Sequence, residues 1–268
     1  MTEEADAVSR FNARVPNIAR VYDYWLGGKD NFAADREVGD KTLEAWPQLA
    51  MGVRANRAFL SRAVKCLAEQ EGIRQFFDIG TGIPSADNTH QVAQSIAPES
   101  RIVYTDSDPV VLSHARALLK SSPAGACDYI DGDLRDTSRI LQRAAETIDF
   151  SKPVGIMLIA VMHWIPDADD PYAIVRELVD TVMPGSYLVL SHPALDLGGA
   201  GHGKMVDLLR ELMPVEVTHR TQEQVMRFFA GTELLEPGLV PIAKWRPESD
   251  IQAQSPGALW AGVGRVLK

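Results

Sequence analysis

The stretch Phe76-Phe77-Asp78-Ile79-Gly80-Thr81-Gly82-Ile83-Pro84 joins an apolar run to a glycine turn, and it decides the fold. A short apolar run of this kind is typical of a parallel strand that is buried on both faces. Glycines directly after such a strand let backbone approach a ligand closely, and the next helix can direct its N-terminus at that ligand. We therefore predict an α/β fold with a ligand site at this turn.

A second predicted strand, residues 102–105, ends on Asp106, about one βα unit beyond the glycine turn. An acid at this spacing can accept hydrogen bonds from both hydroxyl groups of a ribose. Ser107 follows it and is expected to contact the same ligand. A glycine turn alone is equally well explained as a plain connection from strand to helix. Its combination with Asp106 predicts an adenosine ligand.

The turn departs from the G-x-G-x-x-G pattern of nicotinamide-dinucleotide proteins. Ser85 stands where the third glycine is expected, and Pro84 removes a backbone N–H that a pyrophosphate would bind. Asp78 would repel a diphosphate but favours a cationic ligand. S-Adenosylmethionine, a sulfonium without phosphate, therefore fits better than NAD. We expect its site to include Asp78, Gly80, Thr81 and Gly82.

Two later segments supply further candidates for this site. Residues 129–134 are expected to form a third strand that ends in Gly-Asp-Leu, where Asp133 can accept from the adenine amino group and Leu134 lies beside it. Asp131, Asp133 and Asp136 can equally be ordinary turn acids, and this alternative stays open. The fourth strand, residues 154–160, leads into Val161 at the edge where open α/β sheets bind ligands.

Length and composition suit one globular enzyme domain without internal repeats. The 268 residues are 46% hydrophobic, which allows a large core. The net charge of −9 and the pI of about 5.2 argue against a nucleic-acid partner. No run of 18 apolar residues and no signal peptide is present, so we expect no membrane association. The only cysteines, Cys66 and Cys127, indicate no disulfide framework, and a cytoplasmic location is expected.

Predicted strands alternate with helices from residue 76 to residue 192, which is the pattern of a parallel sheet covered on both faces. Asp108-Pro109 and Asp170-Pro171 each predict a helix start, because an N-cap acid precedes proline. Thr221 and Gln224 form a capping-box pattern. A fifth strand is expected at residues 186–191, and residues 233–242 and 259–267 are predicted to form a final antiparallel pair.

Residues 1–70 precede the first sheet strand, and we predict that they form a helical cap over a sheet domain of residues 71–268. Tyr22 and Trp25 lie before a double glycine and are expected to face a sulfonium through cation–π contacts. At helical spacing Trp25 can equally be a core residue. Lys29 and Asn31, after the glycines, are expected to offer polar contacts to the ligand, and the glycines to act as a hinge for a lid.

Arg57 lies on a predicted helix and is expected to pair with the amino-acid carboxylate of the ligand. The alternative is an arginine that is simply solvated.

Eight stretches of the chain resemble one family: ARVYDYWLGGKDNFAADRE, NRAFL, QFFDIGTGIP, NTHQVAQ, VYTDSDPVVLSHARALL, VMHWIPDADDPYAIV, SYLVLSHP and PGLVPIAKWRP. They are similar to the actinobacterial S-adenosylmethionine-dependent methyltransferases once classed as a domain of unknown function, and they span nearly the whole chain. The resemblance implies a Rossmann-like seven-stranded, mostly parallel sheet with an antiparallel C-terminal hairpin and an N-terminal helical cap. It implies S-adenosylmethionine as cofactor and S-adenosylhomocysteine as product, but it does not identify the acceptor.

His163 is the candidate general base for those acceptors that must lose a proton. It lies just after the fourth strand, in an H-x-x-x-D element similar to that of small-molecule O-methyltransferases. A histidine with an ordinary pKa near 6.5 can take a phenol or hydroxyl proton. A structural histidine that lines the cofactor pocket is the alternative.

The other histidines show no zinc-binding spacing, so no metal is expected: His90, His114, His192, His202 and His219. His192 ends the fifth strand and is a weaker candidate for the acceptor side. Residues 193–203, with four glycines, are predicted to form either a mobile flap there or an ordinary surface loop.

Three functions are compatible with these residues. The first is a methyltransferase that acts on a small-molecule acceptor. The second is a regulatory protein that binds the cofactor without turnover, and the third is an NAD-dependent oxidoreductase, which Pro84 and Ser85 disfavour.

Overall fold

The computed structural model describes residues 12–118, 120–214 and 216–267, which include one central sheet. Its strands are β1 (Gln75–Ile79), β2 (Arg101–Asp106), β3 (Ala126–Asp131), β4 (Gly155–Ile159), β5 (Tyr187–Pro193), β6 (Thr232–Leu234), β7 (Val240–Pro241) and β8 (Leu259–Val266). The strand order is β3-β2-β1-β4-β5-β8-β6, and β7 pairs with β8 beside this path. β1 to β5 run parallel, whereas β8 is antiparallel to β5, β6 and β7. The predicted fold class is confirmed.

Two strand boundaries differ from the prediction. The third strand covers residues 126–131 rather than 129–134, so that Asp133 and Leu134 lie in the loop after it. The predicted strand at 233–242 is divided into β6 and β7 by a turn, in which the N–H of Gly238 donates to the carbonyl of Leu235 at 2.8 Å. Gly132 lies in the loop after β3, and Pro237 and Gly238 lie in the turn between β6 and β7, so both interruptions fall at residues that favour turns.

The helices between the parallel strands alternate with them as the sequence predicts: α5 (Thr89–Ile96), α6 (Pro109–Leu118), α7 (Thr137–Ala144) and α8 (Pro171–Thr181). The sheet is preceded by α2 (Ile18–Leu26), α3 (Ala33–Ala45) and α4 (Leu49–Glu69), and β5 is followed by α9 (Ala200–Leu212), α10 (Gln222–Met226) and α11 (Asp250–Ala253). The predicted caps are present: Asp170 accepts from the Ala173 N–H, and Thr221 and Gln224 form the capping box. Residues 200–203 begin α9 rather than completing a loop, because packing against α3 overrides the low helix propensity of glycine.

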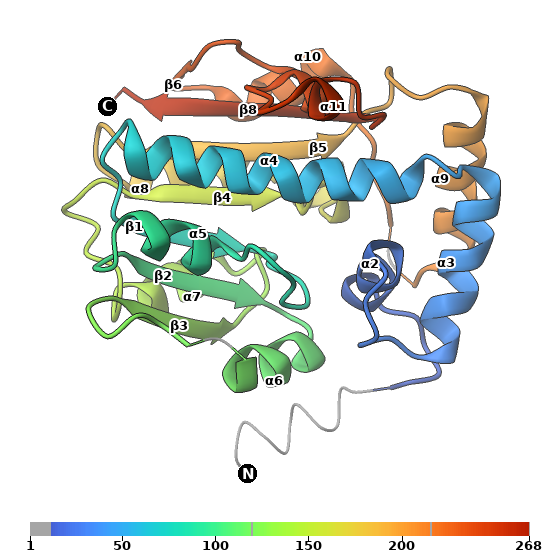
Figure 1. Cartoon of the computed structure of the whole chain (residues 1–268), viewed down its shortest axis with the longest axis horizontal. Coiled ribbons are helices and arrows are strands. Elements are labelled where there is room, and N and C mark those ends of the chain that lie inside the picture. The colour runs from blue at the N-terminus through green and yellow to red at the C-terminus, as the bar shows by residue number, and fades with distance from the viewer. Residues whose placement is uncertain (1–11, 119, 215, 268) are drawn as a thin grey trace.

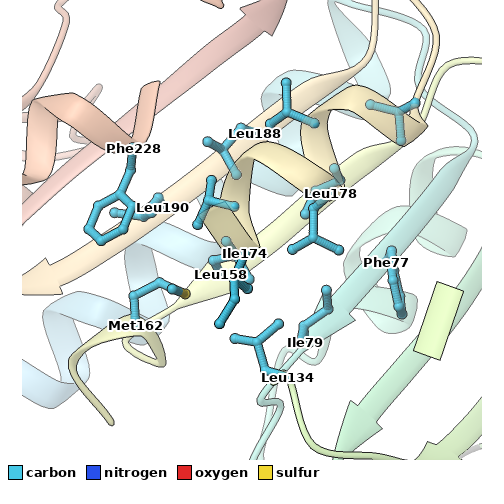
Figure 2. Close-up of a cluster of buried hydrophobic side chains, with 14 of the residues drawn as sticks. Phe77, Ile79, Leu134, Leu158, Met162, Ile174, Leu178, Leu188, Leu190 and Phe228 are labelled. Carbon is cyan, nitrogen blue, oxygen red and sulfur yellow. The ribbon is translucent and has the colours of Figure 1, made fainter. Parts of the chain in front are cut away.

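Side chains alternate between the two faces of the sheet and form two cores. On one face, Phe77, Leu158 and Leu188 pack with Leu178 of α8 and Phe228 (Figure 2). On the other face, the neighbouring residues Phe76, Met157 and Val189 pack under α4 and α5. This alternation is what a sheet covered by helices on both faces requires.

A third apolar cluster lies beyond the sheet and joins α2, α3 and α9 through Val21, Trp25, Val38, Met205 and Leu209. Figure 1 shows these helices on the side to which the arrowheads of the parallel strands point. They therefore face the carboxyl ends of the strands, where open α/β sheets bind ligands. Among the described residues, no helix combines the length and apolar character needed to cross a membrane.

Candidate functional site

A cavity of about 330 Å³ lies at the carboxyl ends of the parallel strands, between the sheet and α2, α4 and α9. Its volume falls within the ~300–1,000 Å³ that small-molecule sites occupy. Most of the predicted site residues line it: Tyr22, Trp25, Arg57, Asp78, Gly80, Thr81, Gly82, Asp106, Ser107, Asp133, Leu134, Val161 and His163. The fold thus brings together residues that are far apart in the chain.

The glycine turn is shaped for close approach. Gly80 has φ of +73°, and a Cβ at this position would lie 2.3 Å from the Val161 side chain, so only glycine fits. The N–H of Gly82 donates to the Asp106 carboxylate at 2.9 Å, and a Cβ at Gly82 would meet no atom within 4 Å. The turn is therefore fixed by Asp106 and is open on its outer side.

Two carboxyl groups line the cavity beside the glycine turn, those of the buried Asp78 and the half-buried Asp106. Burial raises the pKa of Asp78 to about 6, although the Thr89 hydroxyl donates to it at 2.6 Å. Burial also raises the pKa of Asp106 to about 6, although the hydrogen bonds that it accepts from the N–H groups of Asp108 and Gly82 lower this pKa. Each carboxylate would be stabilised by a cationic or hydroxyl-rich ligand.

Arg57 projects from α4 to the same half of the cavity. Its Nη2 donates to the carbonyl oxygens of Ala86 and Asp87 at 3.1 and 3.2 Å, while its Nε is buried without a hydrogen-bond partner among the described residues. Arg57 is therefore held by the loop before α5 rather than freely solvated. A buried guanidinium N–H without a partner suits a ligand carboxylate.

Asn56 was not predicted as a site residue, yet it is 2% exposed and lines the cavity. It accepts from the Ser191 hydroxyl at 2.6 Å and donates to the Tyr22 hydroxyl at 2.9 Å. Ser191 in turn accepts from the Ala160 N–H at the end of β4. A continuous chain of hydrogen bonds thus links the sheet edge to α2. Asn56 stands between Arg54 and Arg57 on the same helix, so the sequence did not distinguish it from an ordinary polar helix residue.

His163 lies on a short 3-10 helix, η1 (Met162–Trp164), directly after β4. Its side chain lines the cavity and is 7% exposed, and its Nδ1 has no partner among the described residues. Burial lowers the pKa of His163 well below 6.5, and the neighbouring His192 lowers it further. The imidazole is therefore neutral at pH 7 and is a weak base.

The η1 loop is held by Arg220, which is 1% exposed. Its Nη1 donates to the carbonyl of Met162 at 3.0 Å, and its Nη2 donates to the carbonyl of Ile165 at 3.0 Å and to the Asp167 carboxylate at 2.6 Å. The backbone of the same segment also binds η1, since the Thr218 N–H donates to the carbonyl of His163. The position of His163 thus depends on a segment more than 50 residues later.

Four of the six histidines form a cluster at this end of the cavity, which the sequence did not predict. The ring centroids of His163 and His219 are 6.3 Å apart, and those of His219 and His202 are 5.3 Å apart. These three line the cavity, whereas His192 is fully buried behind them and does not. Among the described residues, no group of His, Cys, Asp or Glu side chains is arranged to hold a metal ion.

Lys29 and Asn31, predicted as ligand contacts, do not line the cavity. The Asn31 amide donates to the Asp23 carboxylate at 2.8 Å and to the carbonyl of Gly28 at 3.1 Å, and Lys29 is exposed. Gly27 ends α2 with φ of +85°, so the first glycine serves as a helix C-cap. The prediction did not consider that polar residues after a helix can form hydrogen bonds with the end of that helix, as Asn31 does here with Asp23 and Gly28.

The chemistry of the cavity fits S-adenosylmethionine. Asp78 and Asp106 supply acceptors for cationic and hydroxyl groups, and the buried Nε of Arg57 supplies a donor for a carboxylate. The open glycine turn leaves room for an adenosyl group, and Pro84 supplies no N–H to a phosphate.

Comparisons with known proteins identify the family. Residues 4–267 match the sequence model of a family described as S-adenosyl methyltransferase. A DUF574 family protein from Streptomyces avermitilis is 40% identical, with a TM-score of 0.90 and coverage of 95% of this chain and 98% of that chain. A presumed methyltransferase from Thermobifida fusca is also 40% identical, with a TM-score of 0.86 and coverage of 95% and 96%. No curated protein matches the chain.

A more distant likeness supports the fold alone. Human N-acetylserotonin methyltransferase, in a structure with S-adenosylmethionine, is 16% identical, with a TM-score of 0.50 and coverage of 99% of this chain and 66% of that chain.

Proposed function

The chain belongs to the S-adenosyl methyltransferase family, and from this premise we propose that it methylates a small-molecule acceptor held beside His163. It is an S-adenosylmethionine-dependent methyltransferase, as the family establishes. The observation that supports the proposed site best is that one cavity is lined both by the acids Asp78 and Asp106 and by the neutral imidazole of His163. One half can bind the methyl donor, and the other can bind the group that receives it.

The cofactor half has a set of residues with distinct roles. Asp106 would accept from the ribose hydroxyls, and Arg57 would bind the amino-acid carboxylate while Asp78 balances the positive charge. Asp133, beside Leu134, would accept from the adenine amino group, and Val161 and Ser107 would complete the wall. Tyr22 and Trp25 would place aromatic faces against the sulfonium, and a cation–π contact of this kind stabilises binding by about 0.5–2 kcal/mol. Lys29 and Asn31 have no part in this proposal.

His163 acts on the acceptor. When bound, S-adenosylmethionine supplies a methyl group whose bond to sulfur breaks as its bond to the acceptor forms. The residues of the chain hold the reacting groups in line and keep water out. A neutral His163 takes the proton that the acceptor loses and later passes it to water.

The acceptor is proposed to be small because the site is enclosed by the N-terminal helices. Ile18, Tyr22 and Trp25 of α2 form one wall of the cavity, which is consistent with a cap within residues 1–70, of which 1–11 lie outside the described residues. The net charge of −9 favours an acceptor other than a nucleic acid. Two free cysteines are consistent with a cytoplasmic location.

A thermal-shift experiment with three ligands tests the proposal. S-Adenosylmethionine and S-adenosylhomocysteine should raise the melting temperature, because a ligand at 100 times its Kd adds about 2.7 kcal/mol to the free energy of unfolding. NAD should have no effect, since the turn at Gly80 lacks donors for a pyrophosphate. A response to NAD without a response to S-adenosylhomocysteine would overturn the proposed function.

A further inference from the structure

The two halves of the cavity differ in charge. The first half contains the acidic and basic residues that line the cavity. They come from α4, from β1 and β2, and from the loops after β2 and β3: Arg57, Asp78, Asp106, Asp108, Asp133 and Arg135. The other half, here called the histidine half, is defined by Trp46, His163, Trp164, His202, Met205 and His219. The polar side-chain groups of these six residues are imidazole and indole rings. None of the six therefore carries a permanent charge.

Two buried nitrogen atoms in the histidine half have no hydrogen-bond partner among the described residues. They are Nδ1 of His163 and Nδ1 of His219, and each side chain belongs to a residue that is 7% exposed. A neutral imidazole carries one donor and one acceptor, and a buried polar group without a partner costs about 1–3 kcal/mol. With Nδ1 unpartnered, no group among the described residues fixes the tautomer of either ring, so each ring can present a donor or an acceptor to a ligand group in the cavity.

The histidines are held in the neutral form. Burial lowers the pKa of His219 to about 3, and the nearby His202 lowers it further. The buried cation of Arg220 does not line the cavity, and it pairs with the Asp167 carboxylate at 2.6 Å. Arg135 lines the cavity and donates to the carbonyl of Trp164 at 3.2 Å, but its guanidinium pairs with the carboxylates of Asp133 and Asp169. Among the described residues, a carboxylate in the histidine half would therefore find no unpaired cation, and an ammonium group would find no unpaired anion.

The walls of this half are flat aromatic surfaces. The ring centroids of Trp46 and His202 lie 4.9 Å apart, with an angle of 69° between the ring planes. The ring centroids of His163 and Trp164 lie 4.5 Å apart. Aromatic ligands pack well against such rings in stacked or edge-to-face arrangements. Met205 adds an adaptable apolar contact.

We propose that the histidine half binds an uncharged acceptor whose aromatic ring carries a hydroxyl group, with that hydroxyl between His163 and His219. The inference rests on the proposed function and adds the substrate class and a second acceptor-binding residue, His219. The hydroxyl proton passes to His163 as the oxygen gains the methyl carbon, and His163 then releases it to water. A phenolic hydroxyl suits a weak base, because its ordinary pKa near 10 is far lower than that of an aliphatic alcohol.

The test uses three probes of one size that differ in charge: 2-naphthol, 2-naphthoate and (2-naphthyl)methylamine. Each is titrated calorimetrically at pH 7.5 into the full-length protein saturated with S-adenosylhomocysteine. We expect 2-naphthol to bind at least tenfold more tightly than the anion or the cation. Equal or tighter binding of either charged probe, or no binding of 2-naphthol, would overturn the substrate class.

A variant tests the role of His219. His219→Phe keeps an aromatic ring but removes both nitrogen atoms, and we expect it to weaken 2-naphthol binding about tenfold without changing the affinity for S-adenosylhomocysteine. His219→Gln, which restores a donor and an acceptor, should recover part of the loss. His114→Phe is the matched control, because His114 lies on α6 outside the cavity lining.

Unchanged 2-naphthol binding in His219→Phe would show that His219 does not contact the acceptor. An equal loss of both affinities would assign the effect to folding and would likewise contradict the proposal. Failure of the wild-type protein to bind S-adenosylhomocysteine would instead overturn the proposed function itself.

Discussion

Asn56 and Tyr22 are joined by a hydrogen bond of 2.9 Å from the side-chain amide of Asn56 to the hydroxyl of Tyr22. Asn56 belongs to α4, which packs on the sheet, and Tyr22 belongs to α2, which forms part of the cavity wall. Burial raises the pKa of Tyr22, so its hydroxyl stays protonated and donates to the carbonyl of Val53 at 3.3 Å. The N-terminal segment is thus attached to the sheet through a residue of the site.

Tyr22→Phe should lower the free energy of unfolding by about 1–3 kcal/mol, because it leaves the buried amide of Asn56 without its acceptor. Urea unfolding followed by circular dichroism measures this change. Tyr24→Phe is the matched control: it also removes a hydroxyl from α2, but the Tyr24 hydroxyl donates to Asp40 at the surface. If both variants lowered the free energy of unfolding equally, the hydrogen bond between Asn56 and Tyr22 would contribute no more to stability than a surface hydrogen bond.

Asp106→Ala should weaken S-adenosylhomocysteine binding at least tenfold, because hydrogen bonds to a charged group contribute about 1.5–3 kcal/mol each. Asp106 also accepts from the N–H groups of Gly82 and Asp108, so its loss loosens the glycine turn as well. Calorimetric titration measures the affinity. Asp106→Asn keeps one acceptor and should lose less. An unchanged affinity in a folded Asp106→Ala protein would mean that the ribose binds elsewhere.

Binding of S-adenosylhomocysteine should weaken as the pH falls below 6. Burial raises the pKa of both Asp78 and Asp106 from 3.8 to about 6, and the ligand requires the ionised carboxylates. A single carboxylate with this pKa predicts an affinity about tenfold lower at pH 5 than at pH 7. Asp78→Asn should reduce the pH dependence, and a constant affinity from pH 5 to pH 7 would contradict the prediction.

The same two acids affect the ligand-free protein in the opposite direction. Between about pH 4 and pH 6 the folded protein keeps protons that the unfolded chain has released. The contribution of Asp78 and Asp106 to the free energy of unfolding therefore falls as the pH rises through this window and is lowest above pH 6. Adding S-adenosylhomocysteine at pH 7 should offset this effect, since the ligand stabilises the ionised forms.

Local patterns were sufficient to predict the sheet and to single out residues that line the cavity beside the glycine turn. The apolar runs, the N-cap acids before proline and the glycine turn are each read from a few consecutive residues, and Asp78, Gly80 and Asp106 lie where such patterns placed them. The histidine half, apart from His163, could not be predicted in this way. His163, His202 and His219 come from three segments, and their neighbourhood depends on how α9 packs across the strand ends.

The sequence did not predict the Arg20–Asp35 ion pair either. In the sequence, the two residues are indistinguishable from ordinary surface charges on two helices. Arg20 is 3% exposed and donates from Nε to the Asp35 carboxylate at 2.9 Å, and Asp35 is fully buried. Asp35 also accepts from the N–H groups of Asn17 and Phe32 at 2.9 and 2.8 Å. One carboxylate thus joins the starts of α2 and α3.

Asp35→Ala should lower the free energy of unfolding by about 3–5 kcal/mol, because it removes the buried carboxylate that accepts from the Arg20 guanidinium and from two backbone N–H groups. Thermal or urea unfolding measures this change. Asp40→Ala, at an exposed position on the same helix, is the control and should change the free energy by less than about 1 kcal/mol. Similar effects of the two substitutions would show that the buried pair is not needed to hold α2 against α3.

Amide hydrogen exchange over residues 17–37 should slow when S-adenosylhomocysteine is added. Ile18, Tyr22 and Trp25 form one wall of the cavity, so a bound ligand gains contacts with α2 only while this helix is closed over the strand ends. Binding therefore shifts the population towards the closed form and protects its backbone. Mass spectrometry of the exchanged protein, with and without ligand, measures the effect, and the buried strands β4 and β5 should show little local change beyond the gain in global stability.

The interaction between Trp25 and Thr42 provides a second check on this motion. The Trp25 Nε1 donates to the Thr42 hydroxyl at 3.0 Å, so α2 and α3 are expected to move as one unit and to show protection together. Protection of residues 17–26 without residues 33–37 would limit the lid to α2. Exchange that is equally slow with and without ligand would show that the segment is a fixed part of the core, and Tyr22 and Trp25 would then be packing residues rather than parts of a lid.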